Sequence, residues 1–493
     1  MVSERRNLLF INNRAGVNVK TIHLLKNCAM SLIKSISGIR GTIGGKAGQG
    51  LTPVDVVRFT ASFAEWLKRK NPGIRIKVIL GRDARISGRM VHDIVAGTLA
   101  GIGVDVTDIG LTTTPTTEIA VLDTHAHGGI ILTASHNPKQ WNALKLLNCK
   151  GEFLSSIDGD EVLSISEKED FSFAEVQELG HLHTDDSFIQ KHIDKILSLP
   201  LVDVLAIRTA NFRIVVDAVN STGALAIPPL LKALGVRKFD MLNADLTGDF
   251  SHNPEPIPEH LDDLCGAVIK NKADLGLAVD PDVDRLAFIN EVGEPFGEEY
   301  TLVAIADYIL RNNPGNTVSN LSSSQALQMI TEKAGGRYFA SAVGEVNVVE
   351  MMKEKKAVIG GEGNGGVIYP ELHYGRDALV GIALFLTHLA KSGVRCSELR
   401  DRYPSFYISK NKIEFSPESD IDDILEKIRE RYKNRPITTI DGVKIHFDRE
   451  WIHLRRSNTE PIVRIYAESD MQIKAENLAK KIISDFKDIL NGR

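Results

Sequence analysis

Cysteine and long apolar runs are both scarce in this chain. The four cysteines among 493 residues are widely separated, at Cys28, Cys149, Cys265 and Cys396. Their spacing suits neither a metal site nor a disulfide framework, so we expect a reducing compartment and a cytoplasmic protein. No apolar run approaches the ~20 residues that span a bilayer, and we expect no membrane partner.

An excess of charge of either sign is also absent. The 59 basic and 64 acidic side chains give a net charge of -5. This balance argues against nucleic acid or an anionic membrane surface as a partner, so any phosphate site must be a local basic patch. The length is sufficient for three or four domains.

Residues 1–29 differ in composition from the rest of the chain. Five basic side chains accompany the single acidic residue Glu4, and the apolar stretch at 8–11 is too short for a signal-peptide core. We predict a disordered N-terminal extension over 1–29, with a targeting arm as the alternative.

Three segments share one pattern, in which an apolar strand is followed by a polar turn, a helix, a glycine and another strand. The predicted strands at 76–80, 213–216 and 317–318 lead to helices that end near 99, 234 and 334. Such units are typical of α/β layers and predict three related α/β domains in series. One large doubly wound sheet is the alternative.

The region beyond about residue 407 has a different pattern. A strand, a charged helix at 420–433, short strands and a closing helix at 473–490 predict a smaller C-terminal α+β domain. The predicted domain boundaries are 30–172, 173–295, 296–406 and 407–493.

The segment 128–138 ends a short apolar strand in the residues Thr-Ala-Ser-His-Asn-Pro. This places Ser135 at a strand end, where α/β proteins bind ligands and where a serine can accept a phosphoryl group. An ordinary turn is the alternative. The same Ser-His-Asn-Pro sequence recurs at 251–254, but with acidic neighbours that repel phosphate, whereas Lys145 comes after the first copy. We therefore assign chemistry to Ser135 and a turn to Ser251.

Three aspartates, Asp280, Asp282 and Asp284, alternate between two apolar strands. In an extended backbone their carboxylates lie on one side and repel each other unless a hard cation neutralises them. Glu291 stands where a calcium-binding EF-hand places its last ligand, but Arg285 replaces the required glycine and the flanks are strands. The pattern favours a magnesium-like site, with a solvated acidic turn as the alternative.

Two further segments have the composition of ligand-binding loops. The glycine-rich run at 360–366 carries Glu362 and Asn364, whose polar groups suit sugar hydroxyls, although a flexible linker has the same composition. The run Arg-Arg-Ser-Asn-Thr-Glu-Pro at 455–461 can bind a phosphate through guanidinium, hydroxyl and amide groups, and a surface turn is its alternative.

Together, the four segments resemble the phosphoserine, metal, sugar-binding and phosphate-binding loops of the α-D-phosphohexomutase family. The residues 37–42 and 81–83 resemble two further motifs of that family, and the resemblance extends over nearly all of the chain from Ser31 onward. It implies four domains around a central cleft, a small-molecule phosphosugar substrate, Mg²⁺, and a hexose 1,6-bisphosphate as intermediate and activator. We expect a monomer or a homodimer.

The resemblance also implies roles for individual residues. Ser135 would be the phosphoserine and would complete the metal site of Asp280, Asp282 and Asp284. The other catalytic candidates are Lys145 as general acid/base, Arg40 and Arg285 as stabilisers of charge, and His136. The substrate-binding candidates are Glu362 and Asn364 for hydroxyls, Asp377 as a second acid/base candidate, and, for the phosphate, Arg455, Ser457, Asn458, Thr459 and Arg464.

One departure from the family pattern concerns the sugar loop. Many bacterial members end this loop with Ser-Gly-His, whereas this chain has Asn364-Gly365-Gly366 and therefore lacks an imidazole. His373 is a candidate replacement. The variant resembles archaeal-type loops, and our first hypothesis is a phosphoglucosamine mutase, with a phosphomannomutase/phosphoglucomutase as the alternative.

Two alternatives come from other classes of protein. A Ser–His hydrolase requires Ser135 and the adjacent His136 to face each other, but neighbouring side chains of an extended segment point to opposite sides, and no nucleophile elbow is present. A non-catalytic calcium- or sugar-binding protein is the second.

Overall fold

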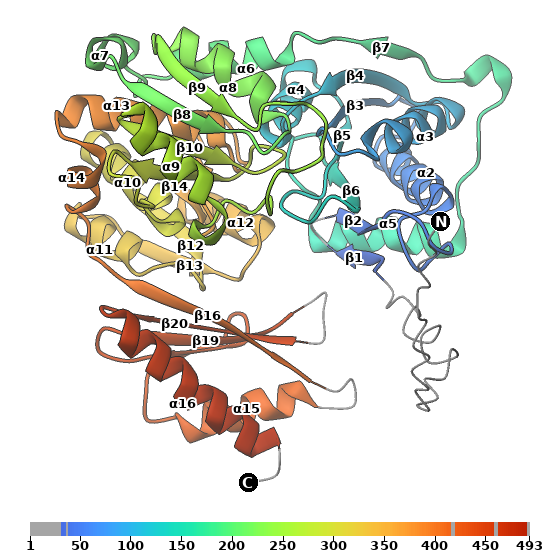
Figure 1. The fold of residues 1–493 in the computed structure, drawn as a ribbon. Helices are drawn as coiled ribbons and strands as arrows, with labels where there is room; N and C mark the ends of the chain where they lie inside the picture. Colours follow the sequence, from blue (N-terminus) through green and yellow to red (C-terminus); the bar gives the residue numbers. More distant parts are fainter. Residues whose placement is uncertain (1–30, 36–37, 416–419, 458–461, 491–493) are drawn as a thin grey trace, which may run out of the picture.

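Four β-sheets succeed one another along the chain (Figure 1). The structure is a computed structural model, and it describes residues 31–35, 38–415, 420–457 and 462–490. The predicted extension over 1–29 lies outside the described residues.

The first sheet has seven strands in the order β1-β2-β6-β5-β3-β4-β7, with helices on both faces. Strand β7 pairs with β4, so this sheet includes residues beyond the predicted boundary at 172, and the exact boundaries stay predictions. Its elements are β1 (Ile33–Ser35), β2 (Gly38–Thr42), α2 (Pro53–Lys70), β3 (Lys77–Arg82), α3 (Gly88–Gly101), β4 (Asp105–Leu111), α4 (Thr114–Thr124), β5 (Gly128–Leu132), β6 (Trp141–Leu147), α5 (Ser156–Lys168) and β7 (Leu182–Thr184).

The second and third sheets have four strands each, in the orders β11-β10-β8-β9 and β13-β12-β14-β15. The second region contains α6 (Phe188–Ser198), α7 (Val204–Ala210), β8 (Arg213–Asp217), α8 (Gly223–Ala233), β9 (Lys238–Leu242), α9 (Asp262–Asn271), β10 (Leu275–Val279) and β11 (Leu286–Asn290). The third contains α10 (Glu298–Asn312), β12 (Asn316–Asn320), α11 (Ala326–Lys333), β13 (Tyr338–Ser341), α12 (Glu345–Lys355), β14 (Ala357–Glu362), β15 (Gly366–Ile368), α13 (Ala378–Ser392) and α14 (Cys396–Arg400).

One four-stranded unit recurs in these three sheets. In each unit the first strand is parallel to the second and to the third, and the third is antiparallel to the fourth. The first strands are β3, β8 and β12, and they begin the three copies that the sequence pattern predicted. The prediction of three related α/β domains is confirmed, and the alternative of one large sheet is wrong.

The unit also explains where the chemical motifs lie. The loop from the third to the fourth strand carries Ser135 in the first domain, the aspartates 280–284 in the second, and the glycine-rich run in the third. Each motif therefore leaves its sheet at the carboxyl end of an equivalent strand. Ligand sites of α/β proteins are found at such strand ends.

The second and third domains share one hydrophobic core. Helix α13 packs against α7 of the second domain and α10 of the third. Within this core the ring of Phe385 stacks on that of Phe288 at 3.7 Å between centroids and meets Phe296 edge-on at 5.4 Å. The sheets are separate, but the apolar packing joins these two domains into one body.

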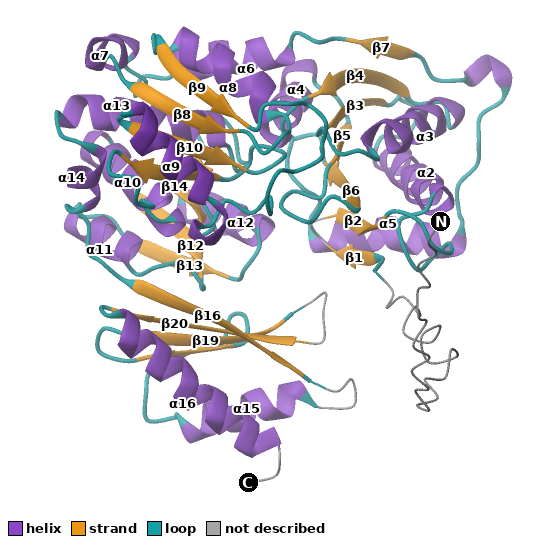
Figure 2. Cartoon of the chain, viewed as in Figure 1, coloured by secondary structure: helices purple, strands orange, loops and turns teal. Residues whose placement is uncertain are grey.

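The fourth sheet is antiparallel, in the order β16-β20-β19-β18-β17, and its two helices cover the face turned away from the other domains (Figure 2). This agrees with the predicted C-terminal α+β domain. Its elements are β16 (Tyr407–Glu414), α15 (Ile421–Arg431), β17 (Ile437–Thr438), β18 (Val443–His446), β19 (Trp451–Arg456), β20 (Ile462–Ser469) and α16 (Gln472–Leu490). Among the described residues, no helix is long and apolar enough to cross a membrane.

The shared core predicts that the second and third domains unfold together. Replacing the buried Phe385 by alanine should cost about 3–5 kcal/mol of unfolding free energy, because the cavity cannot collapse fully. Hydrogen exchange should then quicken in both domains. Phe486→Ala, in the separate core of the fourth domain, is the matched control and should affect that domain alone. Faster exchange confined to α13 in Phe385→Ala would contradict a common unfolding unit.

Candidate active site

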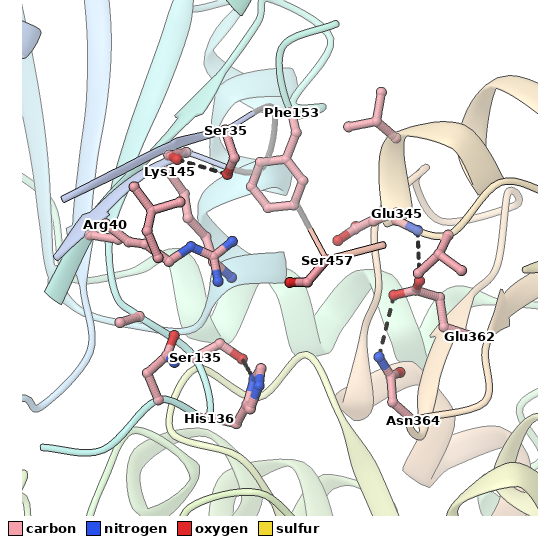
Figure 3. A pocket seen from close by; sticks show the side chains of 18 of the residues that line it. Ser35, Arg40, Ser135, His136, Lys145, Phe153, Glu345, Glu362, Asn364 and Ser457 are labelled. Carbon is pink, nitrogen blue, oxygen red and sulfur yellow. Dashed lines mark hydrogen bonds between the residues drawn. The ribbon is translucent and has the colours of Figure 1, made fainter. Parts of the chain in front are cut away.

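A single large cleft is lined by side chains from all four domains. Its volume is about 1210 Å³, which is ample for a hexose bisphosphate. Figure 3 shows Arg40, Ser135 and Lys145 on one side, and Glu362 and Asn364 on the other. The predicted residues that line the cleft are Arg40, Ser135, His136, Lys145, Arg285, Glu362, Asn364, Arg455, Ser457 and Arg464.

Ser135 lies at the centre of this arrangement with an unusual backbone. Its φ of 48° is left-handed, which is uncommon for a residue other than glycine. Its Oγ donates to Asp280 Oδ2 at 2.6 Å, so the serine of the first domain meets the metal loop of the second.

The same backbone corrects our expectation for His136. In an extended segment this side chain would point away from Ser135, but Nδ1 lies 3.3 Å from Ser135 Oγ (Figure 3), because the left-handed residue turns the chain. Burial and the nearby charge of Arg285 hold the pKa of His136 well below its usual range. The loop joins two antiparallel strands and has no strand-to-helix nucleophile elbow.

The three aspartates of the metal loop form a buried cluster. One oxygen from each lies within 4.8 Å of the other two. Burial and the charges of Asp284 and Asp282 raise the pKa of Asp280 well above its usual range. Oδ1 of Asp282 and Oδ1 of Asp284 are buried without a hydrogen-bond partner. Buried acceptors without donors fit a hard divalent cation such as Mg²⁺, which prefers oxygen ligands.

Cationic side chains offset part of this negative charge. Lys145 Nζ lies 2.7 Å from Asp282 Oδ2 and 3.4 Å from Asp284 Oδ2. Burial alone would lower the pKa of Lys145, but the charges of Asp282 and Asp284 outweigh it and raise that pKa above its usual range. Thr114, at the start of α4, also donates to Asp282 Oδ2 at 2.6 Å.

Arg376 joins the metal loop to the sugar loop, and the sequence analysis missed it. Its guanidinium lies 2.7 Å from Asp284 Oδ2 and 2.7 Å from Glu362 Oε2. One signal was present, since the tripeptide Gly-Arg-Asp at 81–83 recurs at 375–377. Glu345, at the start of α12, is a third partner of this guanidinium and was also missed.

Arg376 also explains the glycine where many relatives have histidine. A Cβ atom at Gly366 would lie 2.3 Å from Arg376 Cδ, a distance too short for any side chain at that position. The space that a side chain at this position would need is therefore occupied by the aliphatic stem of Arg376.

His373 and Asp377 do not line the cleft. Asp377 caps α13 by accepting from Leu379 N at 2.8 Å, and it also contacts His192. His373 lies between Glu118 and Asp377; burial lowers its pKa, but the two carboxylates prevail and raise it to about 10. The cleft wall therefore includes neither Asp377, the second acid/base candidate, nor His373, the candidate replacement for the missing imidazole.

Further cations surround Ser135. Arg285 pairs at 3.0 Å with Glu255, the residue directly after the second Ser-His-Asn-Pro segment. Burial and the charges of Arg285 and Arg376 lower the pKa of Arg40. Three guanidinium groups that repel each other form a site suited to an anion. Ser251 itself is exposed and does not line the cleft.

The fourth domain presents a basic face to the same cleft. Arg455 and Arg464 are direct neighbours on adjacent strands. Asp441 accepts from Arg455 Nε at 2.6 Å and from the Val343 amide of the third domain at 3.0 Å. The predicted phosphate-binding residues Asn458 and Thr459 lie outside the described residues.

Four models of one protein family match most of the chain between residues 32 and 484. The sequence matches the phosphoglucomutase/phosphomannomutase α/β/α domains I, II and III at residues 32–173, 190–293 and 297–406, and the C-terminal domain at 414–484.

Curated relatives match over nearly their whole length. A phosphoglucomutase/phosphomannomutase of Thermococcus kodakarensis is 37% identical, over 92% of this chain and 99% of the relative. A phosphoglucosamine/phosphogalactosamine mutase of Sulfurisphaera tokodaii is 32% identical, over 94% of this chain and all of the relative.

Solved structures of lower sequence identity share the fold. A family protein of Burkholderia thailandensis superposes with a TM-score of 0.79 at 23% identity, covering 93% of this chain and 98% of the other. A putative phosphomannomutase of Thermus thermophilus gives a TM-score of 0.78 at 22% identity, covering 92% and 100%.

The four domain matches and the full-length relatives agree with the cleft that the four loops form. The chain therefore belongs to the phosphoglucomutase/phosphomannomutase family, and it is a phosphohexomutase, an enzyme of the isomerase class.

Proposed function

We propose that this enzyme interconverts hexose 1-phosphate and hexose 6-phosphate through a phosphoserine at Ser135. The observation that carries the proposal is the position of Ser135 Oγ, 2.6 Å from Asp280 in a carboxylate cluster that has two unpartnered oxygens. Asp280, Asp282 and Asp284 would hold Mg²⁺ together with a phosphate oxygen on Ser135. When bound, the cation neutralises charge on the phosphoryl oxygens.

The reaction consists of two phosphoryl transfers. In the first, the bond between phosphorus and Ser135 Oγ breaks while a bond forms to the free hydroxyl of the sugar monophosphate. The bisphosphate then reorients, and its other phosphate returns to Ser135. Arg40, Arg285 and Arg376 balance the charge of the group in transfer.

Lys145 is the proposed carrier of the proton: it would give one to the leaving oxygen and take up the one released by the attacking hydroxyl, so that it ends each transfer protonated. Its ammonium is buried between two carboxylates, which keep it protonated at neutral pH and poised to donate to a leaving oxygen. His136, with its lowered pKa, stays neutral and contacts Ser135 Oγ.

Binding of the sugar is divided between two loops. Glu362 and Asn364 contact sugar hydroxyls, and Arg376 and Asn320 hold the Glu362 carboxylate in place. Arg455, Ser457 and Arg464, with Asn458 and Thr459, bind the phosphate that is not reacting.

Glucosamine phosphate is the proposed substrate. Glu299, Glu345 and Glu362 line the cleft near the sugar loop, and burial raises the pKa of Glu299 to about 8. Glu345 and Glu362 already pair with Arg376, so a 2-ammonium group would supply positive charge to the buried Glu299 carboxyl. The 37% identical relative favours mannose or glucose phosphate as the second candidate. Coupled assays of kcat/KM with the three hexose 1-phosphates decide between them, and a higher value for mannose or glucose would reject the glucosamine assignment.

Ser135→Ala should lower mutase activity about a thousandfold or more, because no other group can carry the phosphoryl intermediate. Ser251→Ala is the matched control, since it changes the same residue in the same local sequence outside the cleft, and it should retain most activity. Steady-state rates of the two variants test the assignment of Ser135 as the phosphoserine. Equal losses of activity in both variants would contradict that assignment.

Asp282→Asn should abolish the effects of Mg²⁺ while the protein stays folded. With Mg²⁺ at 100 times its Kd, the unchanged enzyme gains about 2.7 kcal/mol in unfolding free energy. The variant should gain far less and lose most of its activity. Asp249→Asn removes an exposed carboxylate that pairs with Lys139 and serves as the control. If Asp282→Asn were fully active in excess chelator, the metal site would be wrong.

Arg455→Ala should weaken substrate binding more than it slows chemistry. Charge-assisted hydrogen bonds contribute about 1.5–3 kcal/mol, so KM should rise about ten- to a hundredfold for both the 1- and the 6-phosphate. The rise occurs in both directions because each end of the bisphosphate meets this loop in turn, while kcat should fall less than in Lys145→Ala. Unchanged KM values in both directions would show that Arg455 and its loop do not bind the substrate phosphate.

A further inference from the structure

The left-handed backbone of Ser135 is held by Thr133, at the wall of the cleft, and by Asp83 and Arg85, which do not line it. The Ser135 amide donates to Thr133 Oγ1 at 3.0 Å. The Thr133 hydroxyl donates in turn to Asp83 Oδ2 at 2.6 Å. Thr133 and Asp83 are fully buried. An uncommon backbone conformation persists only where its surroundings hold it in place, and these bonds hold it on the amide side.

Arg85 holds the same loop on the carbonyl side. Its guanidinium donates to four main-chain carbonyls, those of Ser135, Asn137 at 2.7 Å, Pro138 at 2.9 Å and Trp141 at 2.9 Å. The remaining N–H, on Nε, donates to Asp83 Oδ2 at 3.1 Å. A guanidinium has five N–H groups, and each has an acceptor here although Arg85 is only 1% exposed.

The three repeated units allow an internal comparison. The first strand of each unit ends in, or is followed directly by, an aspartate or asparagine. These residues are Asp83, which follows β3, Asp217, which ends β8, and Asn320, which ends β12. In each case Oδ1 accepts from the amide two residues further on, at 3.0, 3.0 and 2.9 Å. The residues that donate these amides are Arg85, Val219 and Ser322. The turn is therefore common to the three domains, but the guanidinium belongs to the first alone.

The other two units hold their functional loops by simpler means. In the second, the hydroxyls of Ser221 and Thr222 donate to the Pro281 carbonyl at 2.7 and 2.8 Å. In the third, Ser323 Oγ accepts from the Gly363 amide at 3.0 Å. Only the loop that carries the nucleophile is held at four carbonyls, which indicates a requirement for fixed geometry beyond that of folding.

We propose that Arg85 is a positioning residue for phosphoryl transfer, because it fixes the backbone of 135–141 so that Ser135 Oγ stays beside the metal loop. The proposal rests on the proposed role of Ser135. Arg85 does not line the cleft and makes no hydrogen bond to the metal loop, although its charge acts on Asp280 and Asp282 at longer range. The change to lysine keeps that charge and removes the geometry. A displacement of about 1 Å at a reacting atom can cost a hundredfold in rate.

The test compares Arg85→Lys with Arg82→Lys. Lysine keeps the charge but cannot reach four carbonyls and a carboxylate, so kcat should fall about ten- to a hundredfold in both directions. KM should change less than threefold, because Arg85 does not contact the proposed distal phosphate site. The Mg²⁺ affinity should be kept, because Arg85 does not contact Asp280, Asp282 or Asp284. Arg82 lies three residues before Arg85, donates only to the Asp83 carbonyl at 3.3 Å and should tolerate the same change.

A second variant covers the case in which Arg85→Lys does not fold. Thr133→Val keeps the shape but leaves the Ser135 amide without its acceptor, and it should lower kcat about tenfold with KM unchanged. If Arg85→Lys folds, an unchanged kcat in that variant overturns the proposal. If only Thr133→Val folds, an unchanged kcat in Thr133→Val overturns it. Ser135→Ala in the same assay keeps the two questions apart, since full activity of that variant would reject the phosphoserine itself.

Discussion

Repulsion among three buried carboxylates is the constraint on which the site depends. Asp280, Asp282 and Asp284 are fully buried within one short loop, and burial makes their mutual repulsion strong. Two cations from other domains, Lys145 and Arg376, each approach to 2.7 Å, and two carboxylate oxygens remain without a hydrogen-bond partner. Cations from the first and third domains thus stabilise a loop of the second, which places the aspartate cluster directly behind Ser135, Lys145 and Arg376 of the cleft wall.

Repetition of one unit brings the required groups to that centre. The same loop, between the third and fourth strands, carries the proposed nucleophile, the proposed metal ligands and, with the strand end before it, the proposed sugar contacts in three successive domains. Because equivalent strand ends of the three domains point at one cleft, the three loops meet there without large changes to the repeated unit. The C-terminal domain carries the proposed distal phosphate site and is linked to the third domain by Asp441, which contacts both Arg455 and the Val343 amide.

Local sequence was sufficient to predict the repeats and the four loops, because strand, turn and glycine signals are short-range. It could not reveal partners that are distant in the chain. Arg376 contacts Asp284 across 92 positions, and its presence explains Gly366. The predicted orientation of His136 was wrong, because the left-handed backbone of Ser135 cannot be recognised from the neighbouring sequence. Asp377 resembled a site residue, yet its carboxylate caps a helix. The common core of the second and third domains likewise depends on long-range packing.

Occupation of the carboxylate cluster by a divalent cation beside Ser135 is tested most directly by anomalous scattering. Crystals of the active, phosphorylated enzyme would be grown with Mn²⁺ in place of Mg²⁺. A single strong peak is predicted within bonding distance of Asp280, Asp282, Asp284 and a phosphate oxygen on Ser135, at about 2.0–2.2 Å. An active enzyme whose crystals show no peak there, or a peak only elsewhere in the cleft, would contradict the metal-centred organisation of the site.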